Sequence, residues 1–124
     1  MSNKPPFVLL VDDSATVRTC LRALFEAAGF VCAEAEDGKE AVEQAGNLKP
    51  DLIVLDYSMP VMNGFEAAPL LKKKLPRTPI LMFTILVNKP LADAALAAGA
   101  TAVVSKDRPS DLIVRAKSLL NLAA

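Results

Sequence analysis

The feature that most constrains the fold is a regular alternation of short apolar runs with segments of helical periodicity. Each run is followed by a stretch in which apolar residues recur at the three- and four-residue spacing of an amphipathic helix. Such β-α units predict an α/β fold: a five-stranded parallel sheet with helices on both faces and right-handed crossovers. The runs are FVLLV (7–11), FVCAEA (30–35), LIVLD (52–56), PILMFT (79–84) and AVVSK (102–106).

Helical segments are expected from Ser14 to Gly29, from Gly38 to Asn47, from about Phe65 to Lys74, from Pro90 to Ala98, and after Pro109. Pro69 lies inside the third segment, where it removes a backbone donor, so we expect a kink or a late start there. The final helix is expected to bury one side, which carries Leu112, Ile113, Ala116, Leu119 and Leu120.

The strands differ in how buried they should be. LIVLD is apolar on both faces, which is typical of a central parallel strand. Glu34 in the second run indicates an edge strand instead. Because no composition shift or long linker interrupts the series, residues 1–124 are expected to form one domain.

Charge and targeting signals exclude several classes of function. The chain carries 14 Lys and Arg against 14 Asp and Glu, so no global attraction to nucleic acid or to an anionic membrane is expected. Residues 1–63 are acidic (−5) and residues 64–124 basic (+5), which suggests an acidic site and a basic far face around residues 72–77. The first apolar run is too short for a signal peptide, so a cytoplasmic location is expected.

Cysteine and histidine usage narrows the chemistry further. Cys20 and Cys32 lie within apolar patterns and are expected to be small buried thiols in a reducing compartment. The chain has no histidine, which excludes histidine general-base catalysis and histidine metal ligation within it.

Polar residues end four of the five predicted strands. In open α/β sheets, ligands bind beyond the carboxyl ends of the strands, at the point where the strand order reverses. An isolated aspartate at a strand end is more often a cap or turn former, and the acidic pair could simply cap the first helix. The coincidence of five such residues nevertheless favours one shared site: Asp12, Asp13, Asp56, Thr84 and Lys106.

Three clustered carboxylates repel one another unless a cation intervenes. Mg²⁺ takes carboxylate oxygens as ligands, and Lys106 adds a second positive charge. A carboxylate can attack phosphorus to form an aspartyl-phosphate, and Thr84 offers a hydroxyl to an anionic oxygen. The residues therefore suggest metal-assisted phosphoryl transfer to Asp56.

The motifs VLLVDDS, DYSMPVMNG, FT and VVSK together resemble the receiver domain of two-component response regulators, over essentially the whole chain. The resemblance implies the flavodoxin-like strand order 2-1-3-4-5 and a phosphorylation-controlled signalling switch. Asp56 would accept a phosphoryl group from a histidine kinase or phosphotransfer protein. Thr84 and Lys106 would contact the phosphoryl oxygens, and Thr84 would move toward them on activation.

The resemblance also implies how Mg²⁺ would be held. Asp13 and Asp56 would be direct ligands, Asp12 would act through water, and Ser58 would contribute its backbone carbonyl. No enzymatic activity is expected beyond the protein's own phosphoryl transfer and dephosphorylation.

Three positions depart from the family pattern. Val103 stands where an aromatic switch residue is usual, so readout through that side chain is not expected. Ile85 replaces a small residue after Thr84, and its bulk predicts slow self-phosphorylation by small donors. Asp107 replaces a proline that is typically cis, so a trans peptide is expected there.

Two alternative functions remain open. Because of these three departures, the chain could be a degenerate receiver that binds its partner without phosphorylation. A small aspartate-nucleophile phosphohydrolase would need a second acid at the position of Ser58, which disfavours that class. No effector segment follows residue 124, so output is expected by binding a downstream target protein, through the fourth helix, fifth strand and fifth helix.

Overall fold

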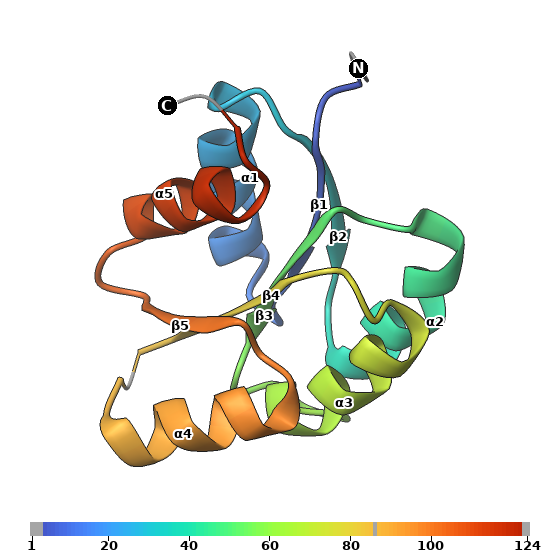
Figure 1. The fold of residues 1–124 in the computed structure, drawn as a ribbon, viewed down its shortest axis with the longest axis vertical. Helices are drawn as coiled ribbons and strands as arrows, with labels where there is room; N and C mark the ends of the chain where they lie inside the picture. The colour runs from blue at the N-terminus through green and yellow to red at the C-terminus, as the bar shows by residue number, and fades with distance from the viewer. Residues whose placement is uncertain (1–3, 86, 123–124) are drawn as a thin grey trace.

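Five parallel strands form one sheet in the computed structural model, which describes residues 4–85 and 87–122 (Figure 1). The strands are β1 (Phe7–Val11), β2 (Val31–Ala35), β3 (Leu52–Asp56), β4 (Ile80–Thr84) and β5 (Ala102–Ser105). Their order, β2-β1-β3-β4-β5, confirms the predicted topology. The helices are α1 (Ala15–Ala27), α2 (Gly38–Leu48), α3 (Gly64–Lys74), α4 (Lys89–Ala98) and α5 (Ser110–Leu119).

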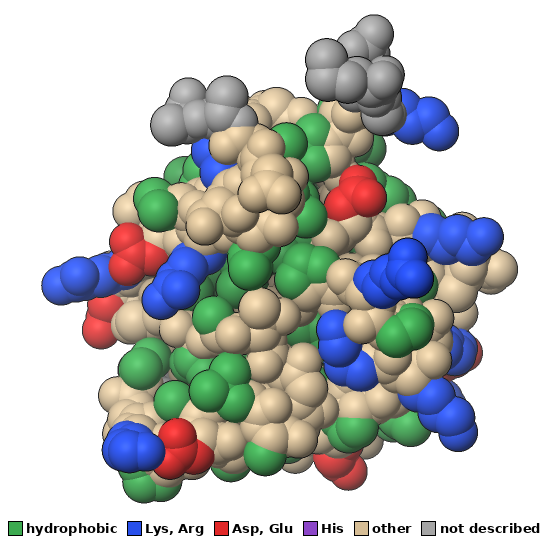
Figure 2. Space-filling model, viewed as in Figure 1, with side chains coloured by type: hydrophobic (Ala, Val, Ile, Leu, Met, Phe, Trp, Pro, Cys, Tyr) green, Lys and Arg blue, Asp and Glu red, His purple; other side chains and the backbone are tan. Residues whose placement is uncertain are grey.

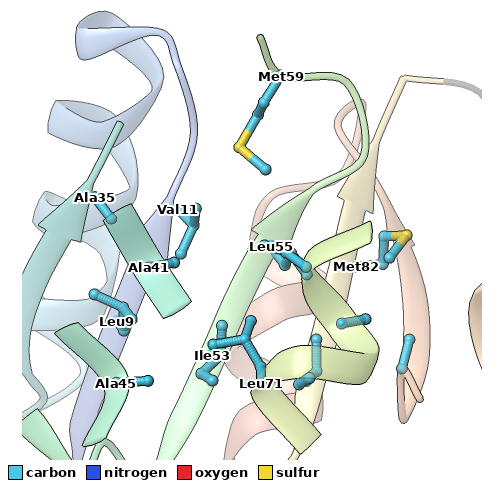
Figure 3. Close-up of a cluster of buried hydrophobic side chains, with 14 of the residues drawn as sticks. Leu9, Val11, Ala35, Ala41, Ala45, Ile53, Leu55, Met59, Leu71 and Met82 are labelled. Carbon is cyan, nitrogen blue, oxygen red and sulfur yellow. The ribbon is translucent and has the colours of Figure 1, made fainter. Parts of the chain in front are cut away.

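The helices cover both faces of the sheet, as predicted. Alternate strand residues point to opposite faces, so each strand contributes to two separate hydrophobic clusters. Leu9, Ile53 and Met82 pack with buried residues of α2, α3 and α4 on one face (Figure 3). Leu10 and Val54 pack with buried residues of α1 and α5 on the other.

The order of the strands determines where a binding site can lie. From β1 the chain crosses to β2 at one edge of the sheet, and then returns to pair β3 with the other side of β1. The direction of winding therefore reverses between β1 and β3, and the helices diverge there. Strand β3 is central and fully buried, and Glu34 lies on the edge strand β2, as predicted.

Helix α3 confirms the helix expected from about Phe65 to Lys74, but of the kink or late start expected at Pro69 the late start is wrong. Helix α3 begins at Gly64, because Asn63 and Glu66 form a reciprocal capping box at its N-terminus. The helix runs across Pro69, which is exposed to solvent. The cap therefore sets where α3 begins, despite the proline.

Two expectations of burial are also wrong. Cys20 is exposed, because it lies about 100° around α1 from the buried Leu21. Leu119 is 37% exposed. The buried stripe of α5 runs through Leu112 and Ala116 and continues to the partly buried Leu120, which takes the next four-residue step.

Basic side chains gather over α2 and α3 in the view of Figure 2. Lys72, Lys73 and Lys74 form the last turn of α3, where positive charge interacts favourably with the helix dipole. They lie at the other end of this helix from Gly64. Among the described residues, no helix has the length and apolar character needed to span a bilayer.

Candidate functional site

The structure brings the predicted site residues together at the carboxyl end of the sheet. Asp12 follows β1, Asp56 ends β3, Thr84 ends β4, and Lys106 follows β5. Asp12, Asp56 and Thr84 are almost fully buried, whereas Asp13 is exposed. A pocket of about 360 Å³ is lined by these five residues and by Ser14, Tyr57, Ser58 and Ile85.

Three carboxylates form the acidic cluster of this pocket. Asp12, Asp13 and Asp56 each offer one oxygen, and these oxygens all lie within 4.8 Å of one another. An arrangement of carboxylate oxygens on a partly open pocket suits a hard divalent cation such as Mg²⁺, which keeps several waters. The acidic cluster therefore fits magnesium binding.

Lys106 bridges two members of the acidic cluster. Its Nζ lies 3.0 Å from Asp12 Oδ2 and 3.2 Å from Asp56 Oδ1. The backbone N–H of Lys106 donates to the carbonyl of Thr84 at 2.8 Å, and its ammonium lies 5.7 Å from the centre of the Phe83 ring. Burial lowers the pKa of Lys106, but its hydrogen bond and ion pairs with the two aspartates outweigh burial and raise it.

Asp56 carries unbalanced negative charge in spite of Lys106. Burial, followed by the neighbouring charge of Asp12, raises the pKa of Asp56 to about 6. Lys106 and the backbone N–H of Ser58, which donates to Asp56 Oδ1 at 3.3 Å, oppose this rise but do not cancel it. Further positive charge in the pocket would therefore favour the ionised form of Asp56.

In the loop between β1 and α1, Ser14 caps the helix and the carboxylate of Asp13 remains available to the acidic cluster. Ser14 is the N-cap of α1, and its Oγ accepts from the N–H of Val17 at 3.2 Å. Asp12 Oδ1 accepts from the N–H of Ser14 at 2.9 Å, so this carboxylate supports the turn before the helix. Asp13 is not the cap, and its exposed carboxylate faces the pocket.

The loop between β3 and α3 closes tightly over the end of β3. A Cβ at Gly64 would lie 2.5 Å from the carbonyl oxygen of Asp56, so only glycine fits there. Met59 extends from this loop toward the hydrophobic cluster and is 9% exposed (Figure 3). Val61 takes a left-handed conformation with φ of 68° although it is β-branched, which is unfavourable.

The departures from the family pattern can also be placed. Ile85 lines the pocket and is 79% exposed. Val103 is partly buried and packs against the cluster on the α2–α4 face. The peptide before Asp107 is trans, since the described residues contain no cis peptide bond.

Sequence reasoning missed Arg18. Its Nη1 donates to the backbone carbonyl of Asp12 at 2.7 Å, and its Nε donates to Glu34. The available signal was its position four residues after Ser14, one helical turn above the acidic loop.

The fold and the site together are those of a signal-receiving α/β module. The family model of the response regulator receiver domain matches residues 8–117. The chemotaxis protein CheY of Thermotoga maritima is 36% identical over 110 residues, covering 88% of this chain and 92% of that protein. The chain therefore belongs to the response regulator receiver domain family, the receiving module of two-component signalling.

Solved structures agree with this assignment. Chemotaxis protein CheY4 of Vibrio cholerae superimposes with a TM-score of 0.87 at 32% identity, over 94% of this chain and 99% of that one. A CheX–CheY–BeF₃–Mg²⁺ complex from Borrelia burgdorferi gives a TM-score of 0.88 at 28% identity, over 94% and 90%.

Other relatives are longer than this chain. It matches the transcriptional regulatory protein LnrK of Bacillus subtilis at 37% identity over 88% of its own length, but spans 50% of that protein. It spans 30% of a protein-glutamate methylesterase/protein-glutamine glutaminase of Methanococcoides burtonii, at 43% identity over 84% of this chain.

Proposed function

We propose that the protein is a magnesium-dependent switch that accepts a phosphoryl group on Asp56 from a histidine kinase or phosphotransfer protein. A carboxylate oxygen of Asp56 attacks phosphorus, the bond from phosphorus to the donor nitrogen breaks, and the imidazole leaves with its electron pair. The phosphorylated protein then changes its affinity for a downstream target in the cytoplasm. The observation that carries this proposal is the convergence of Asp12, Asp13, Asp56 and Lys106 in one pocket.

The residues have separate tasks in the proposed reaction. Asp13 and Asp56, the backbone carbonyl of Ser58 and, through water, Asp12 would hold Mg²⁺. The bound ion would supply charge stabilisation to the transferring phosphoryl oxygens. Lys106, already within 3.2 Å of Asp56 Oδ1, would contact one of those oxygens. Thr84 would donate its hydroxyl to another after moving toward it.

Similarity to the Borrelia complex supports this assignment, because that structure combines a CheY with CheX, BeF₃ and Mg²⁺. A partner protein and a divalent ion are components that the proposed switch would require. We propose that the output surface of this chain lies on α4, β5 and α5, where Leu96 and Val114 are exposed apolar residues.

The test is phosphorylation by acetyl phosphate in Mg²⁺, followed by mass spectrometry of the intact protein. Wild type should gain one phosphoryl group, and Asp56→Asn should gain none. Asp93→Asn is the matched control, because Asp93 is an exposed aspartate of α4 whose side chain pairs with Lys89. A phosphoryl adduct that persists in Asp56→Asn would refute the assignment of the acceptor.

The second candidate is a degenerate receiver that binds its target without phosphorylation. Val103 favours it, because the aliphatic side chain packs against the core and has no ring to redirect. Target binding measured with and without beryllofluoride separates the two functions. Equal affinities would favour the degenerate receiver, and a change would favour the switch.

A further inference from the structure

Arg18 and Glu34 lie beside the acidic cluster without lining its pocket. The side chain of Arg18 is 12% exposed. Its Nη1 donates to the backbone carbonyl of Asp12 at 2.7 Å, and its Nε donates to Glu34 Oε1 at 2.9 Å. Glu34, an acid within strand β2, therefore anchors the guanidinium of Arg18. That guanidinium contacts the acidic loop through the backbone of Asp12.

Two consecutive residues of β2, Glu34 and Ala35, thereby fix the backbone of Asp12 at its carbonyl and at its N–H. The N–H of Asp12 donates to the carbonyl of Ala35 at 3.2 Å. Its carbonyl is held by Glu34 through Arg18. That carbonyl belongs to the peptide group that joins Asp12 to Asp13, so its orientation sets the direction in which Asp13 leaves the strand.

We propose that Arg18 is a positioning residue for the divalent cation, anchored by Glu34. It fixes the peptide between Asp12 and Asp13 so that both carboxylates face the pocket. Because Arg18 binds a backbone carbonyl and not a carboxylate of the acidic cluster, it does not compete with the cation for ligand oxygens. This inference rests on the proposed function, which requires Mg²⁺ at the acidic cluster.

The direction in which Mg²⁺ affinity changes when Arg18 is replaced distinguishes a positioning role from simple charge repulsion. A guanidinium near a cation site repels the cation, so its removal should strengthen Mg²⁺ binding if charge alone matters. Loss of positioning should weaken it. Arg22 is the matched control, because its Nε also pairs with Glu34, at 2.7 Å, and its second ion pair is with Glu26 and not with the acidic loop.

The experiment is calorimetric titration of Mg²⁺ into wild type, Arg18→Gln and Arg22→Gln, at a temperature where circular dichroism shows each to be folded. Arg18→Gln should weaken Mg²⁺ binding about tenfold, and Arg22→Gln should change it less than about twofold. Unchanged or tighter binding by Arg18→Gln would overturn the inference. So would an equal loss in both variants, which would assign the effect to the shared partner Glu34.

Arg18→Lys keeps the positive charge and provides a second test if Arg18→Gln does not fold. One ammonium lacks the planar fork that spans the carbonyl of Asp12 and Glu34, so binding weaker than that of wild type is expected. Wild-type affinity in Arg18→Lys would overturn the inference. Wild type that takes up no Mg²⁺ would overturn the proposed function as well, whereas normal uptake with an unaffected Arg18→Gln would overturn only the role of Arg18.

Discussion

Asp56 shows how a single residue can be costly to the fold and useful to the site. Its side chain is almost completely buried at the end of the central strand, beside Asp12. Lys106 compensates only part of this cost, since the pKa of Asp56 stays raised, at about 6. A carboxyl with a pKa of about 6 is still partly protonated just below neutral pH, and a cation bound beside it would shift it further toward the ionised form.

The raised pKa of Asp56 predicts an unusual dependence of stability on pH in EDTA. The folded state binds more protons than the unfolded state between about pH 4 and pH 6, so the free energy of unfolding should fall as pH rises through this window. Asp56→Asn removes this ionisation and should be more stable than wild type at pH 7 by roughly 1 to 3 kcal/mol. Urea unfolding followed by circular dichroism measures both effects.

The control for this prediction is Asp93→Asn, which changes an exposed aspartate far less affected by burial. It should retain the wild-type dependence on pH. Identical pH profiles for wild type and Asp56→Asn would show that Asp56 does not ionise in this window.

Ile85 borders the pocket with a side chain larger than the family usually has next to the threonine. Replacing it with alanine should widen the approach to Asp56 for a small donor. We expect the rate of phosphorylation by acetyl phosphate in Mg²⁺ to rise about twofold to tenfold in Ile85→Ala, which lowers the barrier by about 0.4 to 1.4 kcal/mol. Val114→Ala, an exposed site on α5, is the control. A rate unchanged by Ile85→Ala would remove the basis for crowding.

At the scale of elements, the loop between β3 and α3 combines close packing with backbone strain. Gly64 permits contact with the end of β3, Met59 anchors the loop in the core, and Asn63 caps α3. Val61 lies between these anchors with φ of 68° and is 74% exposed. The anchors on either side hold Val61 in a conformation that its own side chain disfavours.

Relief of this strain should stabilise the protein. Asparagine tolerates the left-handed region better than valine, so Val61→Asn should raise the free energy of unfolding by about 1 kcal/mol. Val114→Asn makes the same chemical change on an exposed helical position, where the two residues have similar helix propensity, and should be close to neutral. Chemical denaturation of both variants measures the difference. A Val61→Asn variant no more stable than wild type would argue against strain at this position.

At the scale of the whole molecule, the site joins segments that are far apart in the sequence. Lys106 and Asp12 are 94 residues apart, and they meet because the parallel strands β1 and β5 both end at the carboxyl edge of the sheet, where the Lys106 side chain reaches past the ends of β4 and β3. A cation bound across these strand ends binds the folded state alone. Its binding energy therefore adds to the stability of the whole fold.

Mg²⁺ should consequently stabilise the protein against unfolding. At a concentration one hundred times the dissociation constant, the expected gain is about 2.7 kcal/mol, and EDTA should reverse it. Asp13→Asn should lose most of the gain, and Asp93→Asn should keep it. Thermal unfolding with MgCl₂ or EDTA tests this. Equal gains in wild type and Asp13→Asn would place the ion elsewhere.

Much of this architecture could be predicted from the local pattern of the sequence. The period of apolar residues distinguishes strands from helices locally, and a strand apolar on both faces must be central, as β3 is. The polar residues after each strand indicated the site, because parallel strands bring their carboxyl ends to one edge. The strand order itself came from the resemblance to a family, and the structure confirms it.

Other features depend on contacts between segments and could not be predicted from local pattern. The exposure of Cys20 depends on which face of α1 meets the sheet. The ion pair of Arg18 with Glu34, which is 16 residues away, needs α1 and β2 at a defined distance. Periodicity is a property of neighbouring residues, whereas these contacts arise from packing between distant ones, and so they appear only when the chain has folded.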